Sequence, residues 1–385
     1  MKNIKIKGVG LLLLGVLALS SCENELDLQP ISEIGVGNFY RTPEEVNLAV
    51  IAIYSNLQDM EDIEWLVTEL RSDNTYMNPS STETKDLTMR ELDRQVQQSQ
   101  NIHVKEYWQA CYRVINLANI VLQNLNVVTD EAKRNAYEGE ARFLRAHVYF
   151  NLVRLWGGVF LVDHPLTGAE AKTMDRSPQS EVYEFLINDF RQATTLLPET
   201  QGGTSLGRAT ADAAKTLLGK ALLTRKNTGD IAEAKTVLTE VVNGTHALLP
   251  SYASVFDIGN EYNNEVLFAI RYQAGGLGLG SPLPNYFAPL QSENYVVFGN
   301  GDGRNVPTES ITGAYTAGDP RKAASMATQW VGYQGVVNND RHIVKYNSAF
   351  TNVDDGGNDV IVTRYADALL LLACLLYTSD AADEG

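Results

Sequence analysis

The stretch GEARFLRAHVYFNLVRLWGG, residues 139–158, limits the fold of this chain more than any other segment. Read as an α-helix, it carries apolar side chains at intervals of three or four residues along two separate stripes. The first stripe contains Phe143, Ala146, Phe150 and Val153, and the second contains Leu144, Val148, Leu152 and Leu155. A helix with two apolar stripes is packed on both sides, so we expect it to run through a helical core.

His147 lies inside this helix and could instead belong to a buried reactive site. Metal sites and nucleophilic sites both need partners, and no second His or Cys follows at ligand spacing. No neighbouring residue supplies a nucleophile that the imidazole could activate. We therefore expect a structural role for His147. Arg142 and Arg145, three residues apart, share the remaining arc of the helix.

Further helices are predicted along at least the first two-thirds of the chain. RTPEEVNLAVIAIYSNL begins with Thr42 as N-cap, Pro43 at the first helical position and Glu45 closing a capping box. RSPQSEVYEFLINDFRQATTLLP has a similar Ser-Pro start, and helices at about 211–226 and 230–242 are joined by the short turn NTGD. Successive helix pairs of this length suggest a tetratricopeptide-like stack, although the usual repeat consensus does not match in register.

Residues 243–345 have a different sequence pattern, with short runs that alternate between apolar and polar residues and with Gly-rich loops. EVLFAIRYQ alternates as a strand does, RHIVKYN is a second candidate strand, and GGLGLGSPLPNYFAPL is too rich in Gly and Pro for regular structure. The predicted fold class is therefore mainly α, a tetratricopeptide-like helical-hairpin scaffold with loop-rich, short-strand insertions. Long loops on a rigid scaffold are where binding groups are commonly found.

Composition and motifs exclude several classes of function. A formal charge of −16 argues against nucleic acid as a partner, because phosphate binding needs clustered Lys and Arg. GGTSLGRA resembles a P-loop but has Arg208 and Ala209 where Lys and Ser or Thr are needed. Cys111 and Cys374 stand too far apart for a disulfide framework, and we expect no metal, cofactor or catalytic residue. A carboxylate pair for glycoside hydrolysis stays open, because such residues can be distant in sequence.

The N-terminus predicts a lipoprotein. MKNIKIK is a positive segment, and the apolar run GVGLLLLGVLAL that follows is too short to span a bilayer. It ends in LSSC, the pattern that lipoprotein signal peptidase reads before Cys22 is acylated. We therefore expect a signal peptide at residues 1–21 and a membrane anchor of acyl chains on Cys22.

EARFLRAHVYFNLVRLWGGVFLV resembles the signature helix of the SusD/RagB family of outer-membrane nutrient-binding lipoproteins. Further landmarks agree in order, among them GRATADAAKTLLGKALLTRKN, NNEVLFAIRY, GDPRK and RYADALLLLA, and together they reach from residue 22 to about 373. The resemblance implies four tetratricopeptide-like helix pairs and a loop-built ligand surface. It also implies a surface-exposed lipoprotein of the outer membrane that hands glycan to a SusC-like TonB-dependent transporter.

The resemblance predicts how the chain is divided into regions, and it leaves two alternative functions open. It predicts an N-terminal SusD-like helical region at 22–242 and an incomplete C-terminal RagB/SusD region at 243–373. Beyond RYADALLLLA the chain departs from the family pattern, and we interpret CLLYTSDAADEG, residues 374–385, as a non-native tail. The alternative functions are peptide binding by a protein of the same family and, third, a surface glycoside hydrolase.

Two loop regions offer the mixture of aromatic and polar groups that a sugar ligand needs. RSDNTYMNPS supplies Asp73, Asn74 and Tyr76 without an apolar period, and the central insertion supplies Tyr286 and Trp330. In the family the ligand surface draws on the loop after an early helix and on the long central insertion. We select these five residues as ligand-binding candidates.

Overall fold

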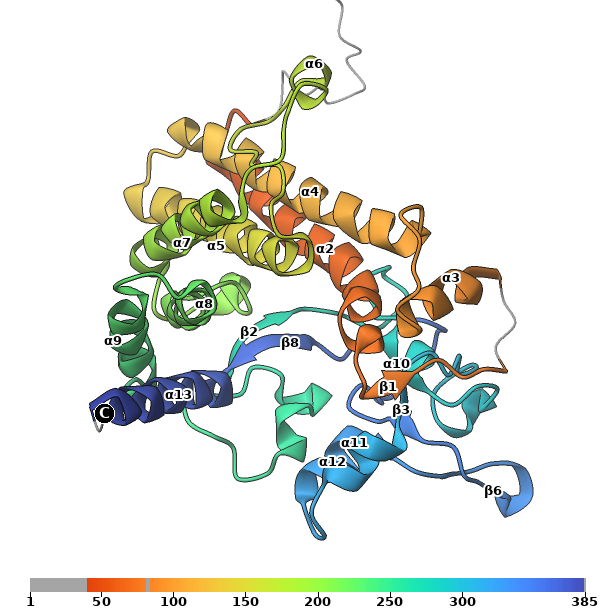
Figure 1. Ribbon diagram of the computed structural model, residues 1–385. Coiled ribbons are helices and arrows are strands. Elements are labelled where there is room, and N and C mark those ends of the chain that lie inside the picture. The colour runs from red at the N-terminus through yellow and green to blue at the C-terminus, as the bar shows by residue number, and fades with distance from the viewer. Residues whose placement is uncertain (1–39, 81–83, 384–385) are drawn as a thin grey trace, which may run out of the picture.

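The computed structural model describes residues 40–80 and 84–383 and is mainly α-helical. Figure 1 shows helices that follow one another around an arc, with a two-stranded ribbon on its inner side and a region of loops and short elements beside it. The signal peptide and Cys22 lie outside the described residues, so their predictions stay predictions. Within the described residues, no helix is both long and apolar enough to cross a membrane.

Helix α2, Pro43–Val67, opens the described fold and begins where the sequence predicted. The Glu45 amide donates to Thr42 Oγ1 at 3.2 Å, and the Thr42 amide donates to the Glu45 carboxylate at 3.0 Å. This reciprocal capping box satisfies two amides that have no partner within the helix. The prediction of the box, with Pro43 at the first helical position, is confirmed.

The helices form a stack in which each packs on the next. Helix α2 packs on α4, α4 on α5, α5 on α7, α7 on α8, α8 on α9, and α9 on α13. Their bounds are Ile102–Gln123 for α4, Glu131–Trp156 for α5, Gln179–Leu196 for α7, Ala211–Arg225 for α8, Asp230–Val242 for α9 and Tyr365–Asp383 for α13. Two shorter helices, α3 at Thr84–Asp93 and α6 at Gly168–Ala171, lie outside this series. The predicted mainly α, tetratricopeptide-like scaffold is confirmed.

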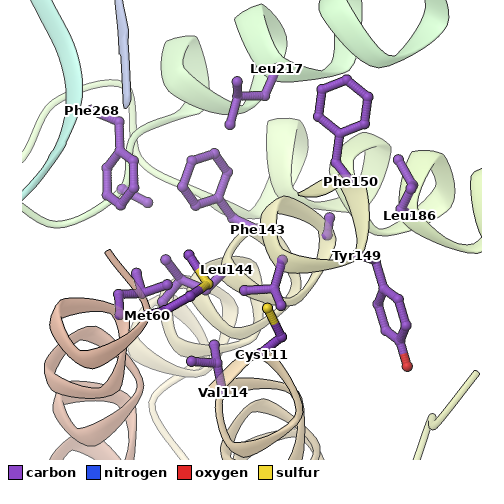
Figure 2. Packing of buried hydrophobic residues seen from close by; sticks show 14 of the residues in the cluster. Met60, Cys111, Val114, Phe143, Leu144, Tyr149, Phe150, Leu186, Leu217 and Phe268 are labelled. Atoms are coloured by element: carbon purple, nitrogen blue, oxygen red, sulfur yellow. The ribbon is translucent and has the colours of Figure 1, made fainter. Parts of the chain in front are cut away.

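Between residues 139 and 153 every residue of helix α5 except the half-buried Arg142 is buried, as its two apolar stripes predicted. Figure 2 shows Phe143 pointing toward Phe268, while Tyr149 leaves the helix in another direction. The Phe143 ring meets Phe268 edge-on with centroids 4.9 Å apart, and it also contacts Phe190 at 6.0 Å. His147 is buried beside it, and burial lowers the pKa of its imidazole to about 3, so it is neutral at physiological pH.

Arg145 on α5 is 3% exposed and is neutralised by Asp189 of α7, which is 1% exposed. Its Nε and Nη2 donate to the two carboxylate oxygens at 2.7 and 3.0 Å, and Arg142 donates to the same carboxylate at 2.9 Å. The Arg145 guanidinium also lies 4.7 Å from the ring centroid of Phe185. The two arginines on one arc therefore share a single buried anion on the neighbouring helix.

The strands β2, Val266–Ile270, and β8, Val360–Arg364, pair in antiparallel fashion against the helices. The strand predicted in EVLFAIRYQ is confirmed, and all of 267–270 is buried. Leu267, Phe268 and Ile270 all belong to the main hydrophobic core. The pair makes the C-terminal region part of the same core as the helices.

Between β2 and β8 the chain forms an insertion of short elements. These are α10 at Leu283–Phe287, β3 at Val306–Pro307, α11 at Glu309–Ala314, α12 at Pro320–Ser325, β4 at Met326–Ala327, β5 at Trp330–Val331, β6 at Val337–Asn338 and β7 at His342–Ile343. The predicted strand in RHIVKYN is confirmed but is only two residues long. The high Gly and Pro content explains why regular structure is brief here.

The C-terminal helix α13 is buried on one side only. Ala368 and Leu375 are buried, whereas Leu370, Leu376 and Tyr377 are exposed. The division at residues 242 and 373 and the non-native origin of 374–385 stay predictions.

We expect Asp189→Asn to destabilise the fold by about 3–5 kcal/mol, because it leaves the Arg145 guanidinium buried without its counter-charge. Chemical denaturation followed by circular dichroism measures this loss. The matched control is Glu233→Gln, which breaks the more exposed Arg191–Glu233 pair and should cost under about 1 kcal/mol. Equal losses in the two variants would contradict a central role for the buried pair.

Candidate functional site

The two loop regions chosen from the sequence lie against each other. Strand β1, Thr75–Tyr76, pairs with β3 in antiparallel fashion, with Tyr76 opposite Val306. The Thr308 amide donates to the Asn74 carbonyl at 2.8 Å, and its hydroxyl donates to the Asp73 carbonyl at 3.1 Å. These bonds use only the backbone of the loop, so the side chains of Asp73 and Asn74 are exposed and available to a ligand.

Trp330 stands on a hairpin formed by β5 and β6 and is half-buried. Its indole N–H donates to the Asp340 carboxylate at 3.0 Å, which fixes the orientation of the ring. Tyr295 lies beside it, with ring centroids 6.3 Å apart and planes inclined by 34°, and is 45% exposed. We call Tyr295 and Trp330 the aromatic pair. On the same hairpin Tyr333 is 69% exposed.

Neighbouring residues connect the aromatic pair to the loop at Tyr76. Asp340 holds Trp330, and Arg341 donates to the Tyr76 hydroxyl at 3.4 Å and to the Pro307 carbonyl at 2.7 Å. Two consecutive side chains therefore link candidates from both loop regions. Hydrogen bonds therefore connect the segment that contains the aromatic pair to the loop that contains Asp73 and Asn74.

Tyr286 has a more enclosed setting on α10. Its ring lies 6.2 Å from that of Trp65, and the Arg304 guanidinium lies 4.5 Å from its centroid on another side. Arg304 is itself buried and paired with Asp302 at 2.9 Å. Burial raises the pKa of the Tyr286 hydroxyl. The ring thus fills space between α2 and the insertion, and only part of it is accessible.

A cavity of about 420 Å³ lies behind the β1–β3 pair, between α2 and the insertion. Of the five candidates only Asn74 lines it. The other lining residues include three acids of α2 and the segment after it, Glu61, Glu64 and Glu69, and an aromatic wall of Trp65, Phe287 and Tyr346. None of these six residues was a ligand-binding candidate from the sequence. The sequence did contain one sign of inward-facing acids: Glu61 and Glu64 continue the helical face on which Ile53 and Leu57 are buried.

Tyr272, which follows β2, joins the half-buried carboxyl group of Asp62 to the buried one of Asp359. Its hydroxyl donates to Asp62 Oδ1 at 2.9 Å, and its amide donates to Asp359 Oδ1 at 3.0 Å. Burial raises the pKa of Asp62 to about 7 although the Tyr272 hydrogen bond opposes the shift. Burial likewise raises the pKa of Asp359 to about 7, against the opposing charge of Arg271.

The Asp62 carboxyl predicts a pH dependence of stability. Its pKa in the folded chain lies above the ordinary value of about 3.9, so the folded state binds the proton more tightly than the unfolded chain. Stability from this group is therefore highest at acidic pH and is lost as the pH rises through its folded pKa of about 7. Asp62→Asn should lessen the fall in melting temperature between about pH 5 and pH 8 and stabilise the chain by about 1–2 kcal/mol at the upper end.

Thermal unfolding across that pH range tests this expectation, with Asp73→Asn as the control at an exposed carboxylate. Curves for Asp62→Asn that run parallel to those of the wild type would contradict it. Asp359 contributes in the same direction in both proteins, whereas the charge of Asp62 helps to raise the pKa of Glu61. The difference between the two slopes therefore reports Asp62 together with its effect on Glu61.

Comparison with known proteins places this fold in a family. Residues 37–223 match the SusD-like family model described as starch-binding associating with outer membrane. SusD-like protein P2 of Formosa agariphila is 28% identical over 97% of this chain and 77% of its own length. A SusD-like protein of Bacteroides ovatus is 30% identical over 43% of this chain and 32% of its own length. The chain is thus similar to SusD-like proteins along nearly its whole length.

Solved SusD-like structures share the fold. A laminarin-binding SusD-like protein superposes with a TM-score of 0.76 at 22% identity, covering 88% of this chain and 81% of its own. Surface glycan-binding protein A from Bacteroides thetaiotaomicron superposes with a TM-score of 0.77 at 19% identity, covering 89% and 79%. At these identities the likeness concerns the fold of the SusD-like chain, while its ligand has to be argued from its own residues.

Proposed function

We propose that this SusD-like chain binds a glycan at the surface formed by the aromatic pair and the Asp73–Tyr76 loop. Sugar rings have apolar C–H faces edged by hydroxyl groups, so they need aromatic rings to stack on and polar groups that accept hydrogen bonds. The pair supplies the first and the side chains of Asp73 and Asn74 supply the second. Tyr286 borders the site as a partly accessible ring.

The observation that carries the proposal is the Tyr295–Trp330 pair, in which an exposed ring lies beside a half-buried one that Asp340 holds in place. Large aromatic rings are normally buried, and two neighbouring accessible rings mark a contact surface for a ligand. Because the indole N–H is bonded to Asp340 at 3.0 Å, little conformational freedom is lost when a ligand stacks on the ring. Relatives with the same fold include one named for laminarin binding and one in complex with laminarihexaose, which supports a glycan as the ligand class.

The proposal includes a cellular setting. Acyl chains on Cys22 anchor the protein to the outer membrane with the binding surface exposed, and a SusC-like TonB-dependent transporter receives the glycan. The family description, association with the outer membrane, supports the location. The chain acts by binding and not by catalysis, which accords with relatives that are named for the glycan they bind.

Trp330→Ala and Tyr295→Ala should each weaken binding of a glycan by at least about 1 kcal/mol, roughly fivefold, because each removes a stacking surface. A glycan array read beside a peptide panel first identifies the ligand, with laminarihexaose and maltohexaose included, and calorimetry then compares the variants. Tyr262→Ala is the matched control, since Tyr262 is an exposed ring that contacts Arg271 away from the pair. Binding of peptides alone, or unchanged affinity in both variants, would contradict the proposal.

Cys22→Ala should release the protein from the membrane into the soluble periplasmic fraction, because the proposed attachment consists only of acyl chains at that residue. Cell fractionation and immunoblotting measure the distribution. Replacement of the neighbouring Ser21 by Ala is the control, which keeps the acceptor cysteine. Membrane retention of the Cys22 variant would refute the anchor.

A further inference from the structure

The cavity behind β1 and β3 contains an acid that has no counter-charge. Glu64 accepts hydrogen bonds from Tyr107 and Asn151, both at 2.9 Å, and the charge of Arg154 opposes the rise of its pKa. Glu69 has the charge of Lys345 nearby. Among the described residues the carboxyl group of Glu61 has neither a hydrogen bond nor an ion pair, and burial together with the charges of Glu64 and Asp62 raises its pKa well above the ordinary value.

A second polar group of the cavity is also without a partner. Asn305, which precedes β3, is 4% exposed and lines the same space. Its Oδ1 has no hydrogen-bond partner among the described residues. A buried amide oxygen left unpaired costs about 1–3 kcal/mol, so an occupant that donates a hydrogen bond would recover that loss. This observation is independent of the acids, since Asn305 belongs to the insertion and not to α2.

The walls define what such an occupant is. Trp65 contacts Phe287 edge-on at 5.2 Å, and Phe287 contacts Tyr346 at 5.9 Å, so three rings form one continuous aromatic wall. Ammonium groups bind well beside aromatic faces, whereas a strongly hydrated metal ion does not need them. The described residues also contain no group of three His, Cys, Asp or Glu side chains that could hold a metal ion. The exposed residues Thr68 and Glu69 are at its border, which gives a ligand access from solvent.

We propose that this cavity is a second binding site, which takes a small primary amine on a hydroxylated body of about the size of an amino sugar. Glu61 is the anchor, and it releases its proton to solvent when the ligand's ammonium group binds beside it, because a nearby cation favours the carboxylate. Asn305 accepts a hydrogen bond from the ligand, and the aromatic wall contacts the ligand's apolar face. The volume of about 420 Å³ lies within the usual range for small-molecule sites. The site is separate from the aromatic pair, because neither Tyr295 nor Trp330 lines it.

Titration of the full chain with glucosamine tests the proposal, with glucose and N-acetylglucosamine as probes that lack the amine. Calorimetry measures affinity, and fluorescence of Trp65 reports occupancy, with Trp65→Phe identifying its signal. Glucosamine should bind saturably and at least ~10-fold more tightly than either neutral sugar, a difference of about 1.4 kcal/mol. Equal affinity for the three sugars, or no saturable binding of glucosamine, would overturn the proposal.

Glu61→Gln should weaken glucosamine binding at least ~10-fold while keeping the size and burial of the side chain. Glu181→Gln, at an exposed acid of α7, is the matched control and should bind as the wild type does. Asn305→Ala tests the second contact and keeps the experiment decisive if the first variant does not fold. Trp330→Ala should leave glucosamine binding unchanged, which separates this site from the proposed glycan surface. Full affinity in both Glu61→Gln and Asn305→Ala would refute the site.

Discussion

The buried ion pair between Arg145 and Asp189 is the interaction on which the rest of the structure depends. It joins α5 to α7 at the point where α5 has neighbours on every side, so the direction of the helix is fixed by charge as well as by packing. Removing water from two charges is costly, and here three donated hydrogen bonds to one carboxylate offset that cost. Apolar packing alone would allow α5 to slide or rotate between its neighbours, whereas the shared carboxylate accepts only one register.

This rigid centre supports a surface made of much shorter elements. The strands β1 and β3 have two residues each, and such a pair is not stable by itself in water. The loop at Asp73 keeps its place because Thr308 donates to the carbonyls of Asp73 and Asn74, and Arg341 donates to the Tyr76 hydroxyl. Both donors belong to the insertion, which β2 and β8 attach to the helices. The binding groups are therefore positioned through a sequence of hydrogen bonds that ends in the helical core.

The parts of the fold that follow from neighbouring residues were predictable, and those that join distant segments were not. The capping box at Thr42 and the double burial of α5 depend on spacings of three or four residues, which the sequence displays directly. The nearness of the Asp73 loop to the central insertion was expected from the family resemblance, because no local pattern encodes it. The setting of Tyr286 against Arg304 was unpredictable, since Gly- and Pro-rich segments have no period that separates inward from outward side chains. The acid-lined cavity combines Glu61 of α2 with Asn305 of the insertion, two positions that only the folded chain brings to one wall.

The pairing of β2 with β8 has an evolutionary consequence. Because the two strands are neighbours, the insertion leaves the core and returns to it at adjacent points, although it contains the residues between 270 and 360. The entropy needed to close a loop rises only with the logarithm of its length, so this segment can gain or lose residues at small cost to the helices. The loops of the insertion can therefore vary in length while its attachment at β2 and β8 stays the same. Substitutions, insertions and deletions in this one segment can change which ligand the surface binds, while the helical stack that supports it keeps its structure.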